Sequence, residues 1–313
     1  MNINILQGDC IETLQKLDDK SINTCITSPP YWGLRNYNDE EKQLGMEDTP
    51  EEFVDNLVKV FREVKRVLRD DGTVWLNLGD SYSSGGRTTT TNQSLRGDKD
   101  YGVTRPKPSK GIKPKDLIGI PWRVAFALQA DGWYLRQDII WHKPNPMPES
   151  VKDRCTKAHE YIFLLSKNVK YYFDNEAIKE DSKYHGKDKR SDKGNIRYEG
   201  KRTSNKDTKA QQSFVTINPK KNKRSVWTVT TKPFKGAHFA TFPMDLIEPC
   251  VLAGCPEGGT VLDPFGGSGT TGIVAVNHNR HAVLCELNQE YIDLAKKRIE
   301  EQAGFLATIN ITK

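Results

Sequence analysis

The sequence has few cysteines and no long hydrophobic run, and each shortage argues against a class of protein. Its 6 cysteines are scattered through 313 residues without a CxxC pair, which argues against a disulfide framework or a zinc knuckle. No apolar stretch approaches the roughly 18 residues that span a bilayer. Residues 1–5 (MNINI) lack the basic segment followed by a hydrophobic one that marks a secretory signal. We therefore expect a cytoplasmic protein.

Charge is nearly balanced over the chain but unevenly placed along it. The 47 Lys and Arg against 41 Asp and Glu give a net charge of +6. Residues 174–224 hold 15 basic against 8 acidic side chains, and residues 83–115 hold 8 against 2. An acidic remainder with two basic segments indicates local contact with a polyanion, although two solvated loops would have the same composition.

Apolar patterns of strand and helix type alternate along most of the chain. Strands are predicted at residues 2–6, 24–27, 73–78, 134–141, 161–165, 260–262 and 282–285. Helices are predicted at residues 11–17, 50–68, 120–130, 270–277 and 289–302, with another starting near 243. Thr49 and Glu52 form a capping-box pattern before the second helix, and Asp71-Gly72 reads as the turn into the third strand. The alternation predicts an α/β fold with a doubly wound, mostly parallel sheet.

Two stretches interrupt this pattern. Residues 83–116 are rich in Gly, Thr, Pro and Lys and are expected to form a mobile basic loop. Residues 174–235 are polar and basic with interspersed aromatic residues, and read as an inserted module. Residues 1–173 and 236–313 would then form one catalytic and cofactor-binding domain.

A glycine-rich turn follows the strand at 260–262. It consists of Asp263, Pro264, Phe265, Gly266, Gly267, Ser268, Gly269 and Thr270. Such a turn lets the backbone approach a ligand, and the next helix presents free N–H groups, although a purely structural turn would look the same. Glu286 ends the next strand, near the spacing used for ribose hydroxyls. No lysine follows the glycines, and Asp263 suits a cation better than a phosphate. A ligand with an ammonium group and a ribose but no phosphate fits this pattern, which indicates S-adenosyl-L-methionine.

A second rigid turn, Ser28-Pro29-Pro30-Tyr31, follows Thr27 at the end of the strand at 24–27. It resembles the catalytic tetrapeptide of the beta-type (permuted) DNA amino-methyltransferases, in which Asp, Asn or Ser precedes Pro-Pro and an aromatic residue. In that family the Ser form is most typical of N4-cytosine enzymes, and the Asp form of N6-adenine enzymes. The order is also that of the family, with the catalytic motif first, target recognition in the middle and the cofactor motif last.

The resemblance implies a Rossmann-like methyltransferase that transfers a methyl group from S-adenosyl-L-methionine to N4 of a cytosine flipped out of double-stranded DNA. N6 of adenine is the alternative acceptor. Ser28 and the Pro29 carbonyl would each accept an amine N–H, so that the nitrogen lone pair points at the methyl group, and Tyr31 would stack on the base. A cognate restriction endonuclease would be a partner, and residues 174–235 the target-recognition region.

Further segments match the same family. Asp9 resembles the acidic residue beside the cofactor adenine, although a helix cap would need the same side chain. The segment at 238–243 resembles the methionine end of the cofactor pocket, to which it would contribute His238, Thr241, Phe242 and Pro243. Thr27 joins this cofactor-binding set. The segment at 141–146, with Arg154, His159 and Glu160, resembles the part that shapes the base pocket.

Three rival functions fit the residues less well. Methylation at cytosine C5 needs a reactive thiolate, but Pro249-Cys250 lies in an apolar helix where a cysteine packs as a small hydrophobe. A metal nuclease needs a carboxylate cluster with a lysine, which is not evident in the sequence, so no metal is expected. A DNA-binding decoy that has lost its chemistry remains an alternative, against which the intact Ser28 and Asp263 motifs argue.

Overall fold

The structure is a computed structural model of the whole chain. It describes residues 1–33, 43–83, 112–182, 219–231, 242–304 and 307–313. Two units are distinguished by their internal contacts, Met1–Asp174 with Ser225–Lys313 as the first and Asn175–Arg224 as the second. His238, Thr241, most of the expected loop at 83–116 and much of 174–235 lie outside the described residues.

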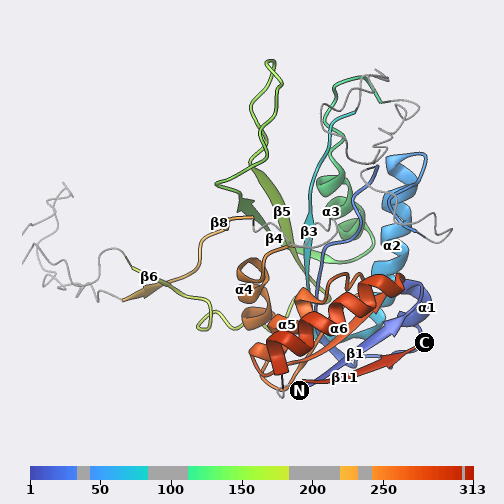
Figure 1. The fold of residues 1–313 in the computed structure, drawn as a ribbon. Helices are drawn as coiled ribbons and strands as arrows, with labels where there is room; N and C mark the ends of the chain where they lie inside the picture. Colours follow the sequence, from blue (N-terminus) through green and yellow to red (C-terminus); the bar gives the residue numbers. More distant parts are fainter. Residues whose placement is uncertain (34–42, 84–111, 183–218, 232–241, 305–306) are drawn as a thin grey trace, which may run out of the picture. The chain divides into compact units, whose positions relative to one another are not determined.

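The first unit contains a nine-stranded sheet in the order β11-β1-β10-β9-β2-β3-β5-β4-β8 (Figure 1). Its strands are β1 (Asn2–Gln7), β2 (Ile22–Thr27), β3 (Leu68–Leu78), β4 (Tyr134–His142), β5 (His159–Ser166), β8 (Val226–Thr228), β9 (Thr260–Asp263), β10 (His281–Glu286) and β11 (Thr308–Thr312). Every neighbouring pair from β11 to β3 is parallel, and β5 runs antiparallel to both β3 and β4. The expected mostly parallel α/β fold is confirmed.

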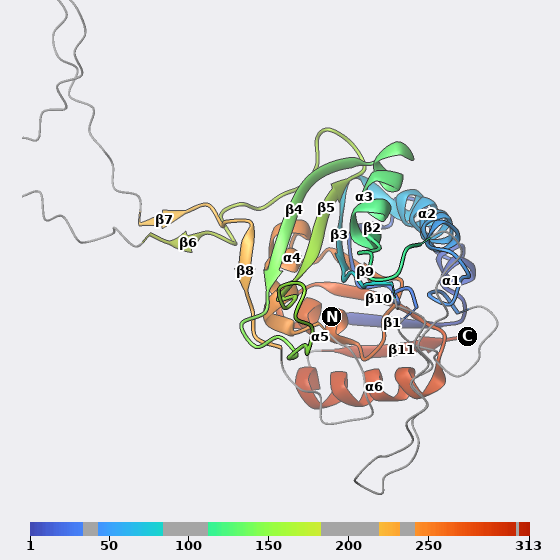
Figure 2. The same cartoon turned by 90° about the horizontal axis from the view of Figure 1, so that it is seen from above.

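Helices cover both faces of the sheet. They are α1 (Cys10–Leu14), α2 (Pro50–Val67), α3 (Ile120–Ala130), α4 (Met244–Gly254), α5 (Thr270–Asn277) and α6 (Gln289–Ala303). Figure 2 shows α1, α2 and α3 on one side of the sheet and α4, α5 and α6 on the other. This arrangement buries the sheet on both faces, as its continuous apolar strands require. Among the described residues, no helix combines the length and apolarity needed to cross a membrane.

Helix α2 forms where its apolar spacing predicts. The core-facing side chains Phe53, Leu57, Phe61 and Val64 are fully buried. The Thr49 hydroxyl accepts a hydrogen bond from the Glu52 backbone N–H at 3.2 Å, and Pro50 occupies the first turn, where its missing N–H has no intrahelical partner to lose. The predicted start of this helix is confirmed.

The structure departs from the expected elements at two places. β3 already begins at Leu68, and the Asp71-Gly72 turn is instead an irregularity inside it, since the pairing with β2 jumps from Leu68 to Thr73. β11 was not expected: Ile309 and Ile311 alternate with polar residues, but the pattern is only five residues long and most of its side chains are exposed. It forms by parallel pairing with β1, whose free edge supplies the hydrogen-bonding partners.

The segment expected as an insert contributes to both units. β6 (Glu180–Asp181) pairs with β7 (Lys220–Lys221) in the second unit, where the Glu180 carboxylate faces three basic side chains, those of Lys221, Lys223 and Arg224. β8 instead extends the main sheet beside β4. Trp227 of β8 is buried, with its ring centroid 6.5 Å from that of Trp75. Aromatic packing therefore anchors the end of this segment in the first unit.

Candidate active site

The two rigid turns meet because their strands are neighbours. β2 and β9 are parallel, with Cys25 opposite Leu262, so both strands end at the same edge of the sheet. The Thr27 hydroxyl donates a 2.6 Å hydrogen bond to Asp263 Oδ1 across 236 positions of sequence. From this point the chain crosses from β2 to β3 on one side and from β9 to β10 on the other. Doubly wound sheets bind their ligands at such a switch of direction.

Asp263 is the buried centre of this junction, with a relative exposure of 2%. Besides Thr27, its carboxylate accepts a 2.6 Å bond from the Thr271 hydroxyl and a 3.1 Å bond from the Phe265 N–H. Burial raises the pKa of Asp263 to about 7, against the opposing effect of these three donors. The carboxylate therefore joins β2, the glycine-rich turn and α5 in addition to any role toward a cationic ligand.

The glycine-rich turn needs its glycines. Gly267 and Gly269 have φ values of +49° and +77°, which disfavour side chains with a Cβ. A Cβ on Gly266 would lie 2.9 Å from the Leu284 Cβ, so this glycine permits the close approach of the turn to β10. α5 begins directly after Gly269 without a side-chain cap, which leaves backbone N–H groups of its first turn for a ligand.

Two acidic residues lie at the same edge of the sheet. Glu286 ends β10, where its two carboxylate oxygens accept bonds from the Gly267 N–H at 2.8 Å and the Asn288 N–H at 2.9 Å. Burial raises the pKa of Glu286. Asp9 follows the adjacent β1 and caps α1, since its Oδ1 accepts bonds from the backbone N–H groups of Ile11 and Glu12. Both carboxylates thus have backbone partners of their own.

The remaining expected cofactor residues are only partly described. Pro243 is buried at the start of α4, preceded by the half-buried Phe242. In the glycine-rich turn, Pro264, Ser268 and Thr270 are buried and Phe265 is half-buried. No three His, Cys, Asp or Glu side chains form a cluster fit for a metal ion in the described part of the chain.

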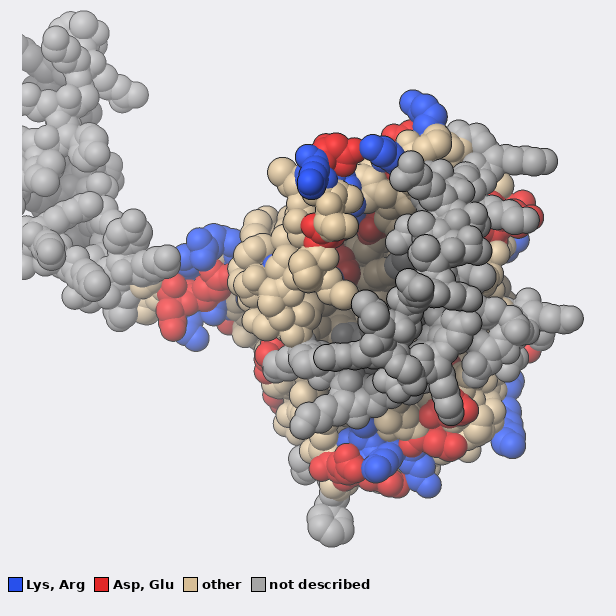
Figure 3. All heavy atoms as spheres, turned by 45° about the horizontal axis from the view of Figure 1, so that its top comes forward, with Lys and Arg blue, Asp and Glu red and all other residues tan. Residues whose placement is uncertain are grey.

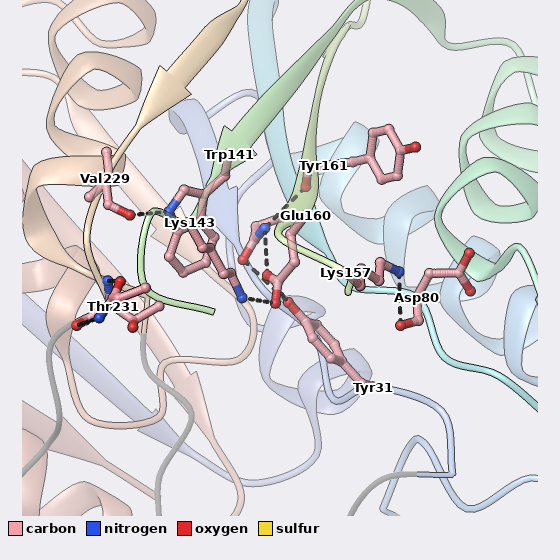
Figure 4. A network of polar contacts seen from close by, with 11 residues as sticks. Tyr31, Asp80, Trp141, Lys143, Lys157, Glu160, Tyr161, Val229 and Thr231 are labelled. Carbon is pink, nitrogen blue, oxygen red and sulfur yellow. Dashed lines mark hydrogen bonds and ion pairs between the residues drawn. The ribbon is translucent and has the colours of Figure 1, made fainter. Parts of the chain in front are cut away.

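The second rigid turn is held by the hydroxyl of its tyrosine. Tyr31 Oη donates a 2.8 Å hydrogen bond to Glu160 Oε2 of β5 and lies 3.4 Å from Asn77 Oδ1 of β3 (Figure 4). Ser28 is half-buried three positions earlier. Burial and the Glu160 charge raise the pKa of Tyr31 well above its usual value. The phenol therefore stays neutral and remains a hydrogen-bond donor.

Glu160 is the centre of a polar network between the ends of three strands (Figure 4). It forms an ion pair with Lys143, which follows β4, and it lies 3.4 Å from the Asn77 amide nitrogen. The Lys157 ammonium donates to the backbone carbonyl of Asp80 at 2.9 Å nearby. Sequence reasoning placed Glu160 and Lys143 only among the residues shaping a base pocket, and it missed Asn77. The feature that could have identified Asn77 is its position near the end of the buried strand β3.

Figure 3 shows a hollow in the surface of the molecule. The described atoms beside the hollow are mostly those of uncharged residues, and acidic side chains lie inside it. A concave, mostly uncharged site with a few polar groups is typical of small-molecule and cofactor binding. Because a bound ligand would be largely removed from water there, polar contacts would be stronger than at an open surface.

Replacing Gly79 with alanine tests whether the Tyr31 ring must keep its position against Gly79. A Cβ at position 79 would lie 2.5 Å from Tyr31 Cε2, well inside normal contact distance. The ring is held by its hydroxyl on Glu160, so displacement would move the whole rigid turn. We expect the rate of the methyl transfer that the two motifs predict to fall by about 10²-fold, since misplacements near 1 Å have effects of that size. Radiolabelled methyl incorporation measures the rate, thermal unfolding controls for stability, and a wild-type rate would contradict the assigned contact.

Comparison with known proteins gives a consistent result. A family model described as DNA methylase (N6_N4_Mtase) matches residues 22–297. The Type II methyltransferase M.SmaI of Serratia marcescens is 50% identical over 298 residues, covering 94% of this chain and 90% of its own. M.Cfr9I of Citrobacter freundii is 48% identical over 296 residues, covering 95% and 87%.

Solved structures share the fold at lower identity. PvuII DNA methyltransferase, described as cytosine-N4-specific, superposes with a TM-score of 0.63 at 19% identity, covering 99% of this chain and 95% of its own. A DNA modification methylase of Thermus thermophilus, solved in complex with S-adenosyl-L-methionine, superposes with a TM-score of 0.59 at 23% identity, covering 99% of both chains.

Proposed function

The chain belongs to the N6_N4_Mtase family of DNA methylases, and from that premise we propose that it methylates N4 of a cytosine flipped out of double-stranded DNA. It is a Type II DNA methyltransferase with S-adenosylmethionine as its cofactor. Support for cytosine N4 comes from Ser28 before Pro-Pro-Tyr. N6 of adenine is the competing acceptor.

One observation carries the proposal. The 2.6 Å bond from Thr27 to Asp263 brings the Ser28–Tyr31 turn and the glycine-rich turn to one edge of the sheet. A group bound at the first turn therefore lies beside a group bound at the second. Direct transfer between two bound partners requires this adjacency.

The residues of the first turn suit an aromatic amine as acceptor. Such an amine is a weak nucleophile because its lone pair is delocalised into the ring. We propose that Ser28 Oγ and the Pro29 carbonyl each accept one N–H, and that this makes the nitrogen pyramidal with its lone pair directed at the methyl donor. Pro30 stiffens the turn, and the Tyr31 ring is placed to stack on the extruded base. When bound, S-adenosylmethionine supplies an electrophilic methyl carbon on a positively charged sulfur.

The second turn suits this cofactor. Its uncapped helix start can receive a carboxylate, and we propose that Glu286 holds the ribose and Asp9 contacts the adenine. We assign cofactor contacts to the turn at 263–270, to Asp9, Thr27 and Glu286, and to the segment at 238–243. Asp263 is buried and has no open face of the kind that a surface ion pair needs, so its proposed part is to fix the turn.

DNA contacts are proposed for the two basic segments. Residues 174–235 would read the target sequence and residues 83–116 would bind phosphates, with a restriction endonuclease as the cognate partner. Exchanging 175–224 for the corresponding segment of a relative with another target should change the methylated sequence and leave the methylated atom unchanged. Sequencing that detects methylated bases directly would identify the sequence around each methylated base. An unchanged target sequence would contradict the assignment.

The acceptor is identified by digesting methylated DNA to nucleosides and analysing them by mass spectrometry. We expect N4-methylcytosine, and its formation should require added S-adenosylmethionine. N6-methyladenine would replace the proposed acceptor with its competitor, and no methylated nucleoside would indicate a DNA-binding protein without the chemistry.

A further inference from the structure

Arg298 of α6 is bonded directly to the glycine-rich turn, and none of the roles assigned above uses it. Its Nη1 donates to the Ser268 carbonyl and to the Ser268 hydroxyl, each at 2.5 Å, and to the Thr270 hydroxyl at 3.1 Å. Ser268 and Thr270 are 3% and 4% exposed and lie on either side of Gly269. One guanidinium therefore ties α6 to the residues that lead into α5.

The sequence of α6 explains why this arginine faces the turn. Ala295 and Arg298 are three positions apart, so they are neighbours on one face of the helix. A Cβ on Gly269 would lie 3.0 Å from the Ala295 Cβ, so that face packs closely against the turn. Lys296 and Lys297 are 49% and 74% exposed and are ion-paired with glutamates one turn further on. Of the three consecutive basic residues at 296–298, all of which the structure describes, Arg298 is the one bonded to the turn.

The guanidinium occupies a place where a positive charge is unfavourable by itself. Arg298 is half-buried, and burial lowers its pKa, although an arginine keeps its charge at neutral pH. Its contact with Thr270, the first residue of α5, also puts it at the positive end of that helix dipole, where cations are disfavoured. An anion bound at the start of α5 would be stabilised by the helix and by Arg298 together.

S-adenosylmethionine has one anionic group, the carboxylate of its methionine part, which accompanies a positive ammonium and a positive sulfonium. We propose that Arg298 positions this carboxylate at the start of α5, by holding Ser268 and Thr270 in place and by adding positive charge next to them. Because the side chain acts through the turn, it is a positioning residue. The inference rests on the proposed cofactor contacts of this turn.

The test compares two ligands that differ only in this carboxylate, S-adenosylmethionine and its decarboxylated form. Arg298→Gln keeps a hydrogen-bond donor and removes the charge. We expect the dissociation constant of S-adenosylmethionine to rise by about tenfold, the effect of a partly buried charge at a helix end, and that of the decarboxylated form to change less than about threefold. Isothermal titration calorimetry without DNA measures both. If Arg298 only stabilised the fold, both dissociation constants would rise by the same factor, and that result or two unchanged constants would overturn the proposal.

Two matched variants control for charge. Lys297→Gln removes a positive charge from the adjacent, exposed position and should leave both dissociation constants within about twofold of wild type. A loss there as large as in Arg298→Gln would show that net charge, and not the position of Arg298, is responsible, and would overturn the proposal. Arg298→Lys keeps the charge but has one nitrogen in place of the planar fork, so it should discriminate between the two ligands better than Arg298→Gln. Equal discrimination by these two variants would overturn the part assigned to the charge.

A measurement on the wild-type protein makes the test independent of whether the variants fold. The decarboxylated ligand should bind to it at least about tenfold more weakly than S-adenosylmethionine. Equal affinity for the two ligands would overturn the proposal, since no carboxylate would then be recognised. Failure of the proposed function is a separate outcome, because it would appear as no methylated nucleoside after incubation with DNA, whereas these titrations contain no DNA.

Discussion

Replacing Ser28 with alanine should lower the single-turnover rate of methyl transfer by about 10²-fold and leave the affinity for S-adenosylmethionine within about threefold of wild type. The variant removes one of the two acceptors that would hold the amine, and it leaves the Pro29 carbonyl as the other. Apart from Thr27, the residues assigned to the cofactor lie on other strands, and the Thr27 hydroxyl bonds to Asp263 rather than to Ser28. Rapid-quench methyl incorporation and calorimetric titration of the cofactor measure the two quantities.

Ser21→Ala is the matched control for this variant. Ser21 immediately precedes the opposite end of β2, where its exposed hydroxyl donates to the Asp18 carbonyl at 2.7 Å. We expect no change in methyl transfer from its loss. A Ser28→Ala protein with wild-type turnover and weak cofactor binding would contradict the role assigned to Ser28.

Asp263→Ala should have the reverse pattern, with loss of cofactor binding and a large loss of stability. Removing the carboxylate leaves two buried hydroxyls and one backbone N–H without their acceptor. An unpaired buried polar group typically costs about 1–3 kcal/mol, so the free energy of unfolding should fall by about 3 kcal/mol. Urea unfolding measures the stability, and equilibrium dialysis with labelled S-adenosylmethionine measures the binding. An intact cofactor affinity in a folded variant would contradict the proposed site.

Asp263→Asn isolates the charge of the same residue. The pKa of Asp263 is raised to about 7 in the folded protein, whereas the ordinary value for aspartate is 3.8. Between these values the folded state holds a proton that the unfolded state has released, so wild-type stability should fall as pH rises through this window. Relative to the asparagine variant, the free energy of unfolding of the wild-type protein should fall by up to about 1.4 kcal/mol per pH unit below pH 7. Above pH 7 this fall should stop. Urea unfolding of both proteins from about pH 5.5 to 8, a range that spans the raised pKa, measures the difference. A difference independent of pH would show that Asp263 is not buried as a neutral acid.

Local sequence signals were sufficient for most of the secondary structure. α2 forms where apolar residues recur at helical spacing behind a Thr49 cap, and α5 spans its expected residues after the glycine-rich turn. These elements depend on neighbours in the chain, which the sequence displays directly. β11 and β8 were not predicted, because an exposed edge strand and a three-residue strand have too short or too polar a pattern. Each forms only because a strand already in the sheet offers a free edge.

Two contiguous motifs were enough to indicate the family chemistry of this protein. The rigidity of Ser28-Pro29-Pro30-Tyr31 and of the turn beginning at Asp263 follows from their own prolines and glycines. What surrounds these motifs depends on the folded sheet. The sheet brings Thr27 onto Asp263 and places Glu160 on the Tyr31 hydroxyl, contacts that span 236 and 129 positions of the chain. Contacts at such separations depend on strand order, and strand order is fixed by the packing of the whole sheet rather than by any local pattern.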